Sequence, residues 1–313
     1  MKPDKVCLVD GSHLAFRNLI ALPDLRAGNI KTGVVYGVLK SLLKIAKKFH
    51  LGLVDIVVCW DFGKSDWRLA LYPEYKAGRH KGGIDIISYR NQLKLLREAL
   101  TLLGLAQFGV QGIEADDLIG ILSERFHKEG RDVLVCSGDQ DMYQLVKDGT
   151  PSIVVIKPPN NDMLGEEEIV KKLGVTPKQV PDFKALVGDK SDNIIGIKGV
   201  GKVKASKLLK EYKWLEVLLR EAGGQKKLIK SMKVQERYRE AVKNIPDGRL
   251  LLNKKLTTIL READTELLTE NQIFEIENWS LLDVEKQNML EFSKLLARLQ
   301  MTSLVGTFYD FTD

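Results

Sequence analysis

Three apolar stretches that each end on an aspartate indicate the fold of this chain: Val6-Cys7-Leu8-Val9-Asp10, Ile56-Val57-Val58-Cys59-Trp60-Asp61 and Val133-Leu134-Val135-Cys136-Ser137-Gly138-Asp139. The intervening pattern predicts helices over 34–46 and 115–128 and a further strand over 153–156. Alternating strands and helices predict an α/β fold with a mostly parallel central sheet flanked by helices. Ligands bind outside the carboxyl ends of parallel strands, so we expect Asp10, Asp61 and Asp139 to meet in one crevice.

Further carboxylates follow these strands and can join the same crevice. They are Glu114, Asp116, Asp117, Asp141, Asp189 and Asp192. Two carboxylates about 4 Å apart repel by roughly 4 kcal/mol at an effective dielectric near 20, so divalent cations must share such a site or some acids must be protonated. An all-oxygen donor set selects Mg²⁺ or Mn²⁺. Any single strand-end aspartate could instead be a helix N-cap, but the recurrence favours a metal site.

The composition suits an enzyme that acts on a polyanion. The 313 residues carry a formal net charge of +6, so an acidic crevice is set in a basic protein. Lysines that only solubilise the surface are the alternative. The cysteines Cys7, Cys59 and Cys136 fall within predicted strands and are expected to be buried and reduced. No signal region or long apolar run is visible, so we expect a cytoplasmic location, nucleoid-associated or in a host cell, and no membrane partner.

The regular pattern breaks between Asp61 and about Gln92, in a stretch rich in rings, cations and glycine. Such an insertion, about 62–92, is typical of a lid or arch. Interleaved aromatic and basic side chains can stack bases and hold phosphates, although a solvated loop is the alternative. The side chains expected to contact nucleic acid here are Arg68, Tyr72, Tyr75, Lys76, Arg79 and Lys81.

From about Pro181 onward the pattern is helical, with no convincing strand. The glycine-rich run from Gly196 to Val203 nearly matches a nucleotide-binding loop, but Val203 replaces the required hydroxyl and no strand precedes it. A helix-hairpin-helix at about 194–210 fits better, with Ala205, Leu208 and Leu209 packed and backbone amides facing phosphates. The residues expected to contact DNA are Lys198, Gly199, Gly201, Lys202, Lys204 and Lys207. An ordinary helical turn is the alternative.

Taken in order, these segments resemble the 5′-nuclease (flap endonuclease) superfamily, and within it the bacterial and phage branch that includes the 5′→3′ exonuclease domain of DNA polymerase I. The resemblance rests on residues 9–17, Asp61, 75–79, 112–118, 139–145, 185–193 with the following hairpin, and 290–308. It covers nearly the whole chain. No polymerase module follows, so a stand-alone nuclease is expected.

The resemblance implies a PIN-like nuclease core over 1–180, with a helical arch insertion, and a helical DNA-binding region over 181–313. It also implies two Mg²⁺ ions, replaceable by Mn²⁺, and a K⁺ ion at the hairpin. Asp10, Asp61 and Asp116 would hold the first Mg²⁺ with Glu114. Asp139, Asp141 and Asp192 would hold the second, with Asp116 bridging and Asp117 and Asp189 supporting. Lys76 and Arg79 would stabilise charge on the phosphate, and Arg17 would contact DNA.

The expected activity is that of a structure-specific 5′ nuclease, both 5′→3′ exonuclease and 5′-flap endonuclease, in DNA replication and repair. Two ions would activate the attacking water and neutralise the leaving 3′ oxygen. The substrates would be DNA with 5′ flaps, free 5′ ends or nicks, and the protein would be a monomer that serves a separate DNA polymerase. The alternatives are a non-catalytic DNA-structure reader on the same scaffold and, less favoured, a PIN-type RNase.

Overall fold

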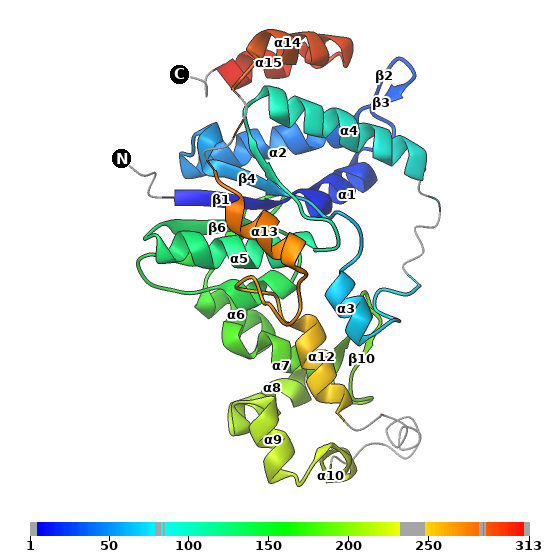
Figure 1. Cartoon of the computed structure of the whole chain (residues 1–313), viewed down its shortest axis with the longest axis vertical. Helices are drawn as coiled ribbons and strands as arrows, with labels where there is room; N and C mark the ends of the chain where they lie inside the picture. The colour runs from blue at the N-terminus through cyan, green and yellow to red at the C-terminus, as the bar shows by residue number, and fades with distance from the viewer. Residues whose placement is uncertain are drawn as a thin grey trace.

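A computed structural model of the chain describes residues 5–78, 83, 85–231, 248–281, 284 and 286–309 (Figure 1). The strands are β1 (Lys5–Asp10), β2 (Arg26–Ala27), β3 (Ile30–Lys31), β4 (Ile56–Cys59), β5 (Ala106–Phe108), β6 (Asp132–Cys136), β7 (Ile153–Lys157), β8 (Asp162–Leu164), β9 (Gly188–Asp189) and β10 (Ile194–Ile195). The 3-10 helices are η1 (Leu53–Asp55), η2 (Asp141–Leu145) and η3 (Pro177–Gln179).

The α-helices are α1 (Gly11–Ala21), α2 (Gly33–Phe49), α3 (Asp66–Leu71), α4 (Ile86–Leu102), α5 (Ala115–Lys128), α6 (Glu166–Leu173), α7 (Val180–Val187), α8 (Lys202–Tyr212), α9 (Leu215–Glu221), α10 (Gln225–Ser231), α12 (Arg249–Thr257), α13 (Glu270–Asn278), α14 (Met289–Arg298) and α15 (Thr302–Tyr309). Among the described residues, no helix is both long and apolar enough to cross a membrane.

The central sheet confirms the predicted α/β fold. Its strands lie in the order β5-β4-β1-β6-β7-β8, and all neighbours are parallel except β7 and β8. The chain builds outward from β1 to β4 and β5 on one side and then to β6 and β7 on the other. The order therefore reverses at β1, and such a switch point is where open α/β sheets bind ligands, at the carboxyl ends of the strands.

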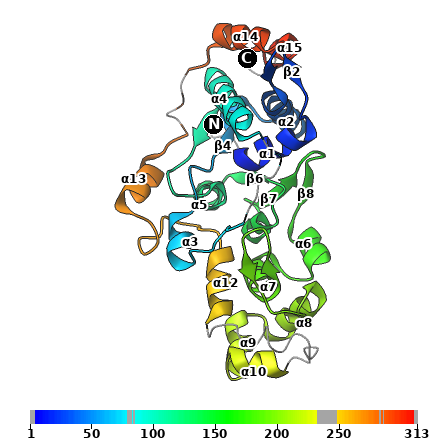
Figure 2. The same cartoon turned by 90° about the vertical axis from the view of Figure 1, so that its right-hand side faces the viewer.

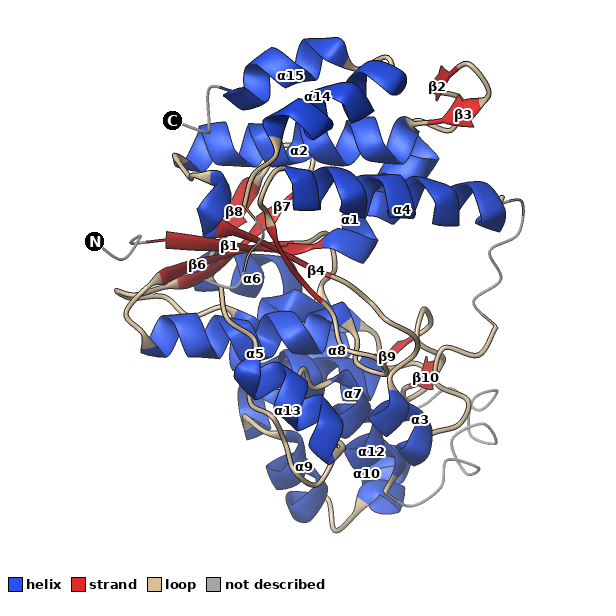
Figure 3. Cartoon of the chain, turned by 45° about the horizontal axis from the view of Figure 1, so that its top comes forward, coloured by secondary structure: helices blue, strands red, loops and turns tan. Residues whose placement is uncertain are grey.

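Two apolar clusters cover the two faces of the sheet (Figures 1 and 3). On one face lie α1, α2 and α4, and α14 and α15 close this layer with Phe292, Leu296 and Phe308 in its core. On the other face lies α5, continuous with a lower lobe that contains α6 to α10 and α12. Cys7, Cys59 and Cys136 are buried and unpaired, as expected.

The structure adjusts several expected boundaries. The helices predicted over 34–46 and 115–128 are confirmed as α2 and α5. The insertion after Asp61 is shorter than expected, because α4 already begins at Ile86, where Asp85 caps its first turn. The expectation of no strand after Pro181 is wrong, since β9 and β10 form a small antiparallel hairpin. The segment 194–210 contains only the second helix of the helix-hairpin-helix; the first is α7, which packs against α8.

Candidate metal centre and nucleic-acid interface

The strand-end acids lie at one edge of the sheet, which Figure 2 views face-on. Asp10 is the last residue of β1 and pairs in register with Cys59, the last residue of β4, so Asp61 lies two residues past the end of the neighbouring strand. The Ser137 hydroxyl donates to Asp10 Oδ2 at 3.1 Å and accepts the Asp139 amide at 3.1 Å. The Asp61 carboxylate accepts the Ala115 amide at 2.7 Å, which ties it to the start of α5. The expected convergence of the three aspartates is therefore present.

Asp10 is the most strongly perturbed acid at this edge. Burial raises its pKa, and the neighbouring charges of Asp61 and Asp139 raise it further, to about 8. Hydrogen bonds from the His13 amide and the Ser137 hydroxyl oppose this rise without cancelling it. The carboxylates are thus crowded beyond what their hydrogen bonds can compensate, as expected where cations complete the charge balance.

The N-terminus of α5 contributes the next acids. Glu114 caps the helix and is contacted by three side chains: Lys76 Nζ at 2.5 Å, Arg68 Nη1 at 3.0 Å and the Tyr75 hydroxyl at 3.1 Å. Burial and the charge of Asp116 nevertheless raise its pKa to about 7. Asp116 is partly exposed and lies 3.9 Å from Arg68 Nη1. Asp116 can face an ion at this edge, and so can Glu114 Oε1, which accepts one hydrogen bond, from Lys76, whereas Glu114 Oε2 accepts two, from Arg68 and Tyr75.

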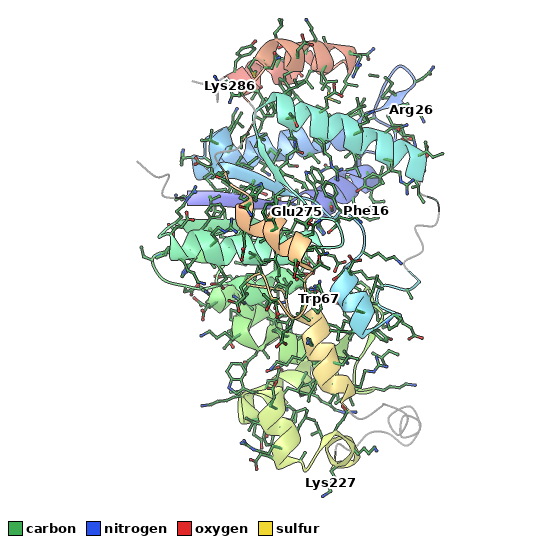
Figure 4. The ribbon with its side chains drawn as sticks, viewed as in Figure 1. Phe16, Arg26, Trp67, Lys227, Glu275 and Lys286 are labelled. Atoms are coloured by element: carbon green, nitrogen blue, oxygen red, sulfur yellow. The ribbon has the colours of Figure 1, made fainter. Side chains whose placement is uncertain are left out.

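Asp117 lies behind them, in a fully buried ion pair with Arg68. Arg68 Nη1 and Nη2 lie 2.6 and 3.0 Å from the two Asp117 oxygens, and Trp67 Nε1 and the Leu260 amide also donate to this carboxylate. Trp67 is visible where α3 meets the core in Figure 4. With both oxygens occupied, Asp117 supports the site through Arg68 and does not face the crevice.

A second acidic group lies where η2 meets the β9–β10 hairpin. One oxygen from each of Asp141, Asp189 and Asp192 lies within 4.8 Å of the others, a spacing that can hold a metal ion. The Asp139 carboxylate accepts the Asp141 amide at 2.9 Å and so borders this group. Asp189, expected only in a supporting position, is one of the three. The oxygen donors of both groups fit Mg²⁺ or Mn²⁺.

Lys184, which sequence reasoning did not single out, lies against the second acidic group. Its ammonium group pairs with Asp141 and lies 2.7 Å from Asp189 Oδ2. Burial would raise the pKa of Asp189, but the Lys184 charge and hydrogen bonds from Lys184 and Ser191 lower it to about 2. No local pattern marks this lysine, because it lies within α7 and meets Asp189 only through the turn into β9.

The base of the expected arch is anchored to the second acidic group. The Lys76 amide donates to the Asp192 carbonyl at 3.0 Å, and Asn193 Nδ2 donates to the Glu74 carbonyl at 2.9 Å. Lys76 and Asn193 both adopt left-handed backbone conformations, with φ of 53° and 59°. Such strained positions cluster at functional sites. Lys76 Nζ therefore lies between Glu114 and, at 3.9 Å, Asp192.

This anchoring corrects part of the predicted DNA interface. Arg68 is 1% exposed and Tyr75 is 2% exposed, and both side chains are bonded to site acids, so neither can contact DNA in this conformation. The Tyr72 ring is buried as well, beneath Arg249. The interleaved rings and cations favoured an exposed, DNA-contacting arch, whereas the partners of Arg68 and Tyr75 in the structure are acids distant in the chain. Arg79 and Lys81 lie outside the described residues.

The predicted hairpin contacts remain at the surface. Gly199 has a φ of 85°, which forms the turn that precedes α8. Ala205 and Leu209 are fully buried, as predicted for the packed face, whereas Leu208, predicted on the same face, is only partly buried. The side chains of Lys198, Lys202, Lys204 and Lys207 are exposed around the start of α8. Arg17, on α1, is partly exposed near the acidic edge.

Comparisons with known proteins agree with this arrangement. A family model described as the 5′-3′ exonuclease N-terminal resolvase-like domain matches residues 5–174, and one described as the 5′-3′ exonuclease C-terminal SAM fold matches 175–280. The chain is 32% identical to a 5′-3′ exonuclease of Aquifex aeolicus over 95% of this chain and 93% of that protein. It is 41% identical to the thermostable DNA polymerase I of Thermus thermophilus over 69% of this chain, but spans only 25% of that relative's length.

Solved structures share the fold. A zinc-bound T5 5′-exonuclease matches with a TM-score of 0.64 and 19% identity, covering 98% of each chain. The catalytic core of Rad2 in complex with a DNA substrate matches with a TM-score of 0.57 and 16% identity, covering 96% of this chain and 92% of that one. With both family models spanning 5–280 and a full-length relative above 30% identity, the chain belongs to the 5′-3′ exonuclease family.

Proposed function

We propose that this protein is a metal-dependent, structure-specific 5′ nuclease that hydrolyses DNA phosphodiesters at free 5′ ends, nicks and the junctions of 5′ flaps. The observation that carries the proposal is the pair of acidic groups at the carboxyl edge of the sheet, bordered by the anchored base of the arch. The DNA named for the Rad2 structure and the divalent ions named for the T5 structure support it.

Two Mg²⁺ ions, replaceable by Mn²⁺, are proposed. Asp10, Asp61, Glu114 and Asp116 would hold one, and Asp139, Asp141, Asp189 and Asp192 the other. When bound, such ions lower the pKa of water and neutralise charge on the attacking and leaving oxygens. The raised pKa of Asp10 means that a bound ion must displace a proton from the cluster at neutral pH, which couples ion binding to proton release.

The chain's own cations orient the substrate. Lys76 Nζ, held between Glu114 and Asp192, is placed to contact a phosphate at the crevice. Lys184 neutralises Asp141 and Asp189, and keeps this carboxylate group ordered before ions arrive. The lysines around Gly199 would hold duplex phosphates, and a K⁺ ion would bind the backbone of this hairpin.

We also propose two regions, a nuclease core over 1–180 and a DNA-binding region over 181–313, in a monomer that works with a separate DNA polymerase on cytoplasmic, nucleoid-associated DNA. Light scattering coupled to gel filtration, with and without flap DNA, tests the monomer. A dimer peak would overturn it.

Cleavage of an end-labelled 5′-flap duplex, with Mg²⁺ or with EDTA, tests the function. Metal-dependent cutting at the junction is expected, leaving a 5′-phosphate and a 3′-hydroxyl, and it should be lost in Asp61→Asn and in Asp192→Asn. Glu291→Gln, at an exposed acid on α14 that pairs with Lys294, is the matched control and should keep wild-type rates.

A second readout separates ion binding from turnover. Mg²⁺ should raise the melting temperature of the wild type and of Glu291→Gln more than that of either site variant. Tight flap binding by the wild type without metal-dependent cutting would instead identify a DNA-structure reader. Faster cutting of a matched RNA flap would favour an RNase.

A further inference from the structure

Three basic side chains lie beside the acidic edge of the sheet, toward β7, the strand that neighbours β6. They are Arg17 on α1, Lys157 at the end of β7 and Lys172 in the last turn of α6. The β6–β7 pairing sets Cys136 opposite Ile156, so Lys157 is level with Ser137, two residues before Asp139. All three side chains are partly exposed.

Arg17 is brought to the same place by α1. It lies one helical turn after His13, on the same face of the helix. The His13 ring packs directly over Gly138, where a Cβ atom would come within 2.5 Å of Nε2. The charges of both Asp139 and Arg17 act on His13. His13 therefore lies between the acidic edge and Arg17.

The three cations are close enough to perturb one another. The positive charge of Lys172, followed by burial and by the charge of Arg17, lowers the pKa of Lys157. The Lys157 and Lys172 side chains contact each other. Among the residues that the structure describes, Arg17 donates to the Pro158 carbonyl, and Lys172 lies 5.4 Å from the centre of the Tyr143 ring. No carboxylate in the described residues forms an ion pair with Arg17, Lys157 or Lys172.

A group of like charges without a counter-charge is unfavourable until an anion arrives. Two unit charges about 4 Å apart repel by roughly 4 kcal/mol at an effective dielectric near 20, and a phosphate between them reverses the sign of the interaction. The group is also linked to the hairpin, because Lys202, the first residue of α8, donates to the Lys172 carbonyl. The three cations therefore lie between the acidic edge and the hairpin.

We propose that Lys157 and Lys172 join Arg17, which is already expected to contact DNA, in a phosphate-binding group for the backbone of duplex DNA, between the scissile linkage and the hairpin contacts. This rests on the proposed nuclease function and adds a positioning site to it. The group touches no reacting atom; it fixes where the duplex lies, so its loss should weaken substrate binding and leave the chemical step unchanged.

The test compares Lys157→Gln/Lys172→Gln with Lys128→Gln/Lys286→Gln, which removes the same charge at exposed positions. Lys128 ends α5 at the opposite edge of the sheet from the acids, and Lys286 lies at the upper left of Figure 4. Flap-DNA binding is measured in EDTA over a series of salt concentrations, and KM and kcat are measured with Mg²⁺.

For Lys157→Gln/Lys172→Gln we expect Kd and KM to rise about tenfold, kcat to stay within about twofold, and the slope of log Kd against log salt to fall by about 1–2. The Lys157→Arg/Lys172→Arg variant keeps both positive charges and should bind DNA like the wild type. A merely structural role of the two lysines would not make binding depend on their charge. Binding and salt slope equal to those of the control variant would overturn the proposal, as would weaker binding with an unchanged salt slope.

Failure of the nuclease function itself is distinguishable. In that case the wild type would not cut flap DNA with Mg²⁺, whether or not it binds the DNA. If the wild type binds and cuts and only the Lys157→Gln/Lys172→Gln variant behaves like its control, the phosphate group alone is refuted.

Discussion

The buried ion pair between Arg68 and Asp117 permits a quantitative test of how the site is supported. We consider Arg68→Met, which keeps much of the side-chain volume but removes the guanidinium. Arg68 donates to both Asp117 oxygens, to Glu114 and to the carbonyls of Leu256 and Thr258, and it is 1% exposed. Its loss leaves a fully buried carboxylate without its counter-charge.

Removing one partner of a buried ion pair costs about 3–5 kcal/mol, so Arg68→Met should lower the free energy of unfolding by about 4 kcal/mol. Adding Asp117→Asn removes the orphaned charge and keeps an acceptor for Trp67 or Leu260. The double variant should therefore be more stable than Arg68→Met, with a coupling energy of about 2 kcal/mol or more.

The assay is denaturant unfolding followed by circular dichroism, in EDTA, for the two single variants, the double variant and the wild type. Arg220→Met is the control, because the Arg220–Glu221 pair, at 3.6 Å, is exposed and should contribute less than about 1 kcal/mol. An Arg68→Met effect no larger than that of Arg220→Met, or a coupling energy near zero, would refute the reasoning. At temperatures where Arg68→Met is folded, the salt dependence of its DNA binding should match that of the wild type.

Three further outcomes follow from the same contacts. In EDTA, the free energy of unfolding should fall as pH rises from about 4 to about 8. The reason is that the pKa values of Asp10 and Glu114 are raised to about 8 and about 7 in the folded protein, whereas unfolded carboxyls titrate near 4. Melting curves over a pH series check this, and a rise in stability over that range would contradict it. Lys184→Met removes a cation that competes for Asp141 and Asp189, so Mg²⁺ should bind about tenfold more tightly by calorimetry, and unchanged affinity would assign Lys184 no such role. Gly120→Ala would place a Cβ atom 2.2 Å from the Leu260 carbonyl oxygen and should destabilise the fold by about 1–3 kcal/mol. Its control is Gly306→Ala, where a Cβ atom has no atom within 4 Å and the change should be neutral or stabilising by up to about 1 kcal/mol. Equal melting temperatures for the two variants would contradict the predicted clash.

The sequence was sufficient for the parts of the site that depend on strand order and local pattern. Apolar runs that end in aspartate predict both the strands and the edge where Asp10, Asp61 and Asp139 meet. The helix from Ala115 to Lys128 was predicted to its ends, because Glu114 begins it and basic residues follow in its last turn. Register between parallel strands then fixes the relative height of these residues.

The remaining features depend on contacts between residues far apart in the chain. Arg68 looks like a surface cation in its own stretch, and only its contacts with Asp117 and with the Leu256 carbonyl bury it. Lys184 reaches the acids because the chain turns from α7 into β9, which a helical pattern does not show. Contacts between residues so far apart in the chain leave no periodic signal in the sequence. For that reason the burial of Arg68, Tyr72 and Tyr75 was not predicted.

The position of α14 and α15 has a consequence for how the chain reaches its native state. These last described helices pack on α2 and α4, and the Asn288 amide bonds to the Leu102 carbonyl across 186 residues of sequence. A nascent chain that has emerged only to α13 would leave the apolar face of α2 and α4 uncovered. Such long-range closure slows folding and leaves apolar surface open to aggregation or to a chaperone until α14 and α15 have emerged. Helices that carry none of the site acids thus decide when the sheet that carries the acidic edge becomes rigid.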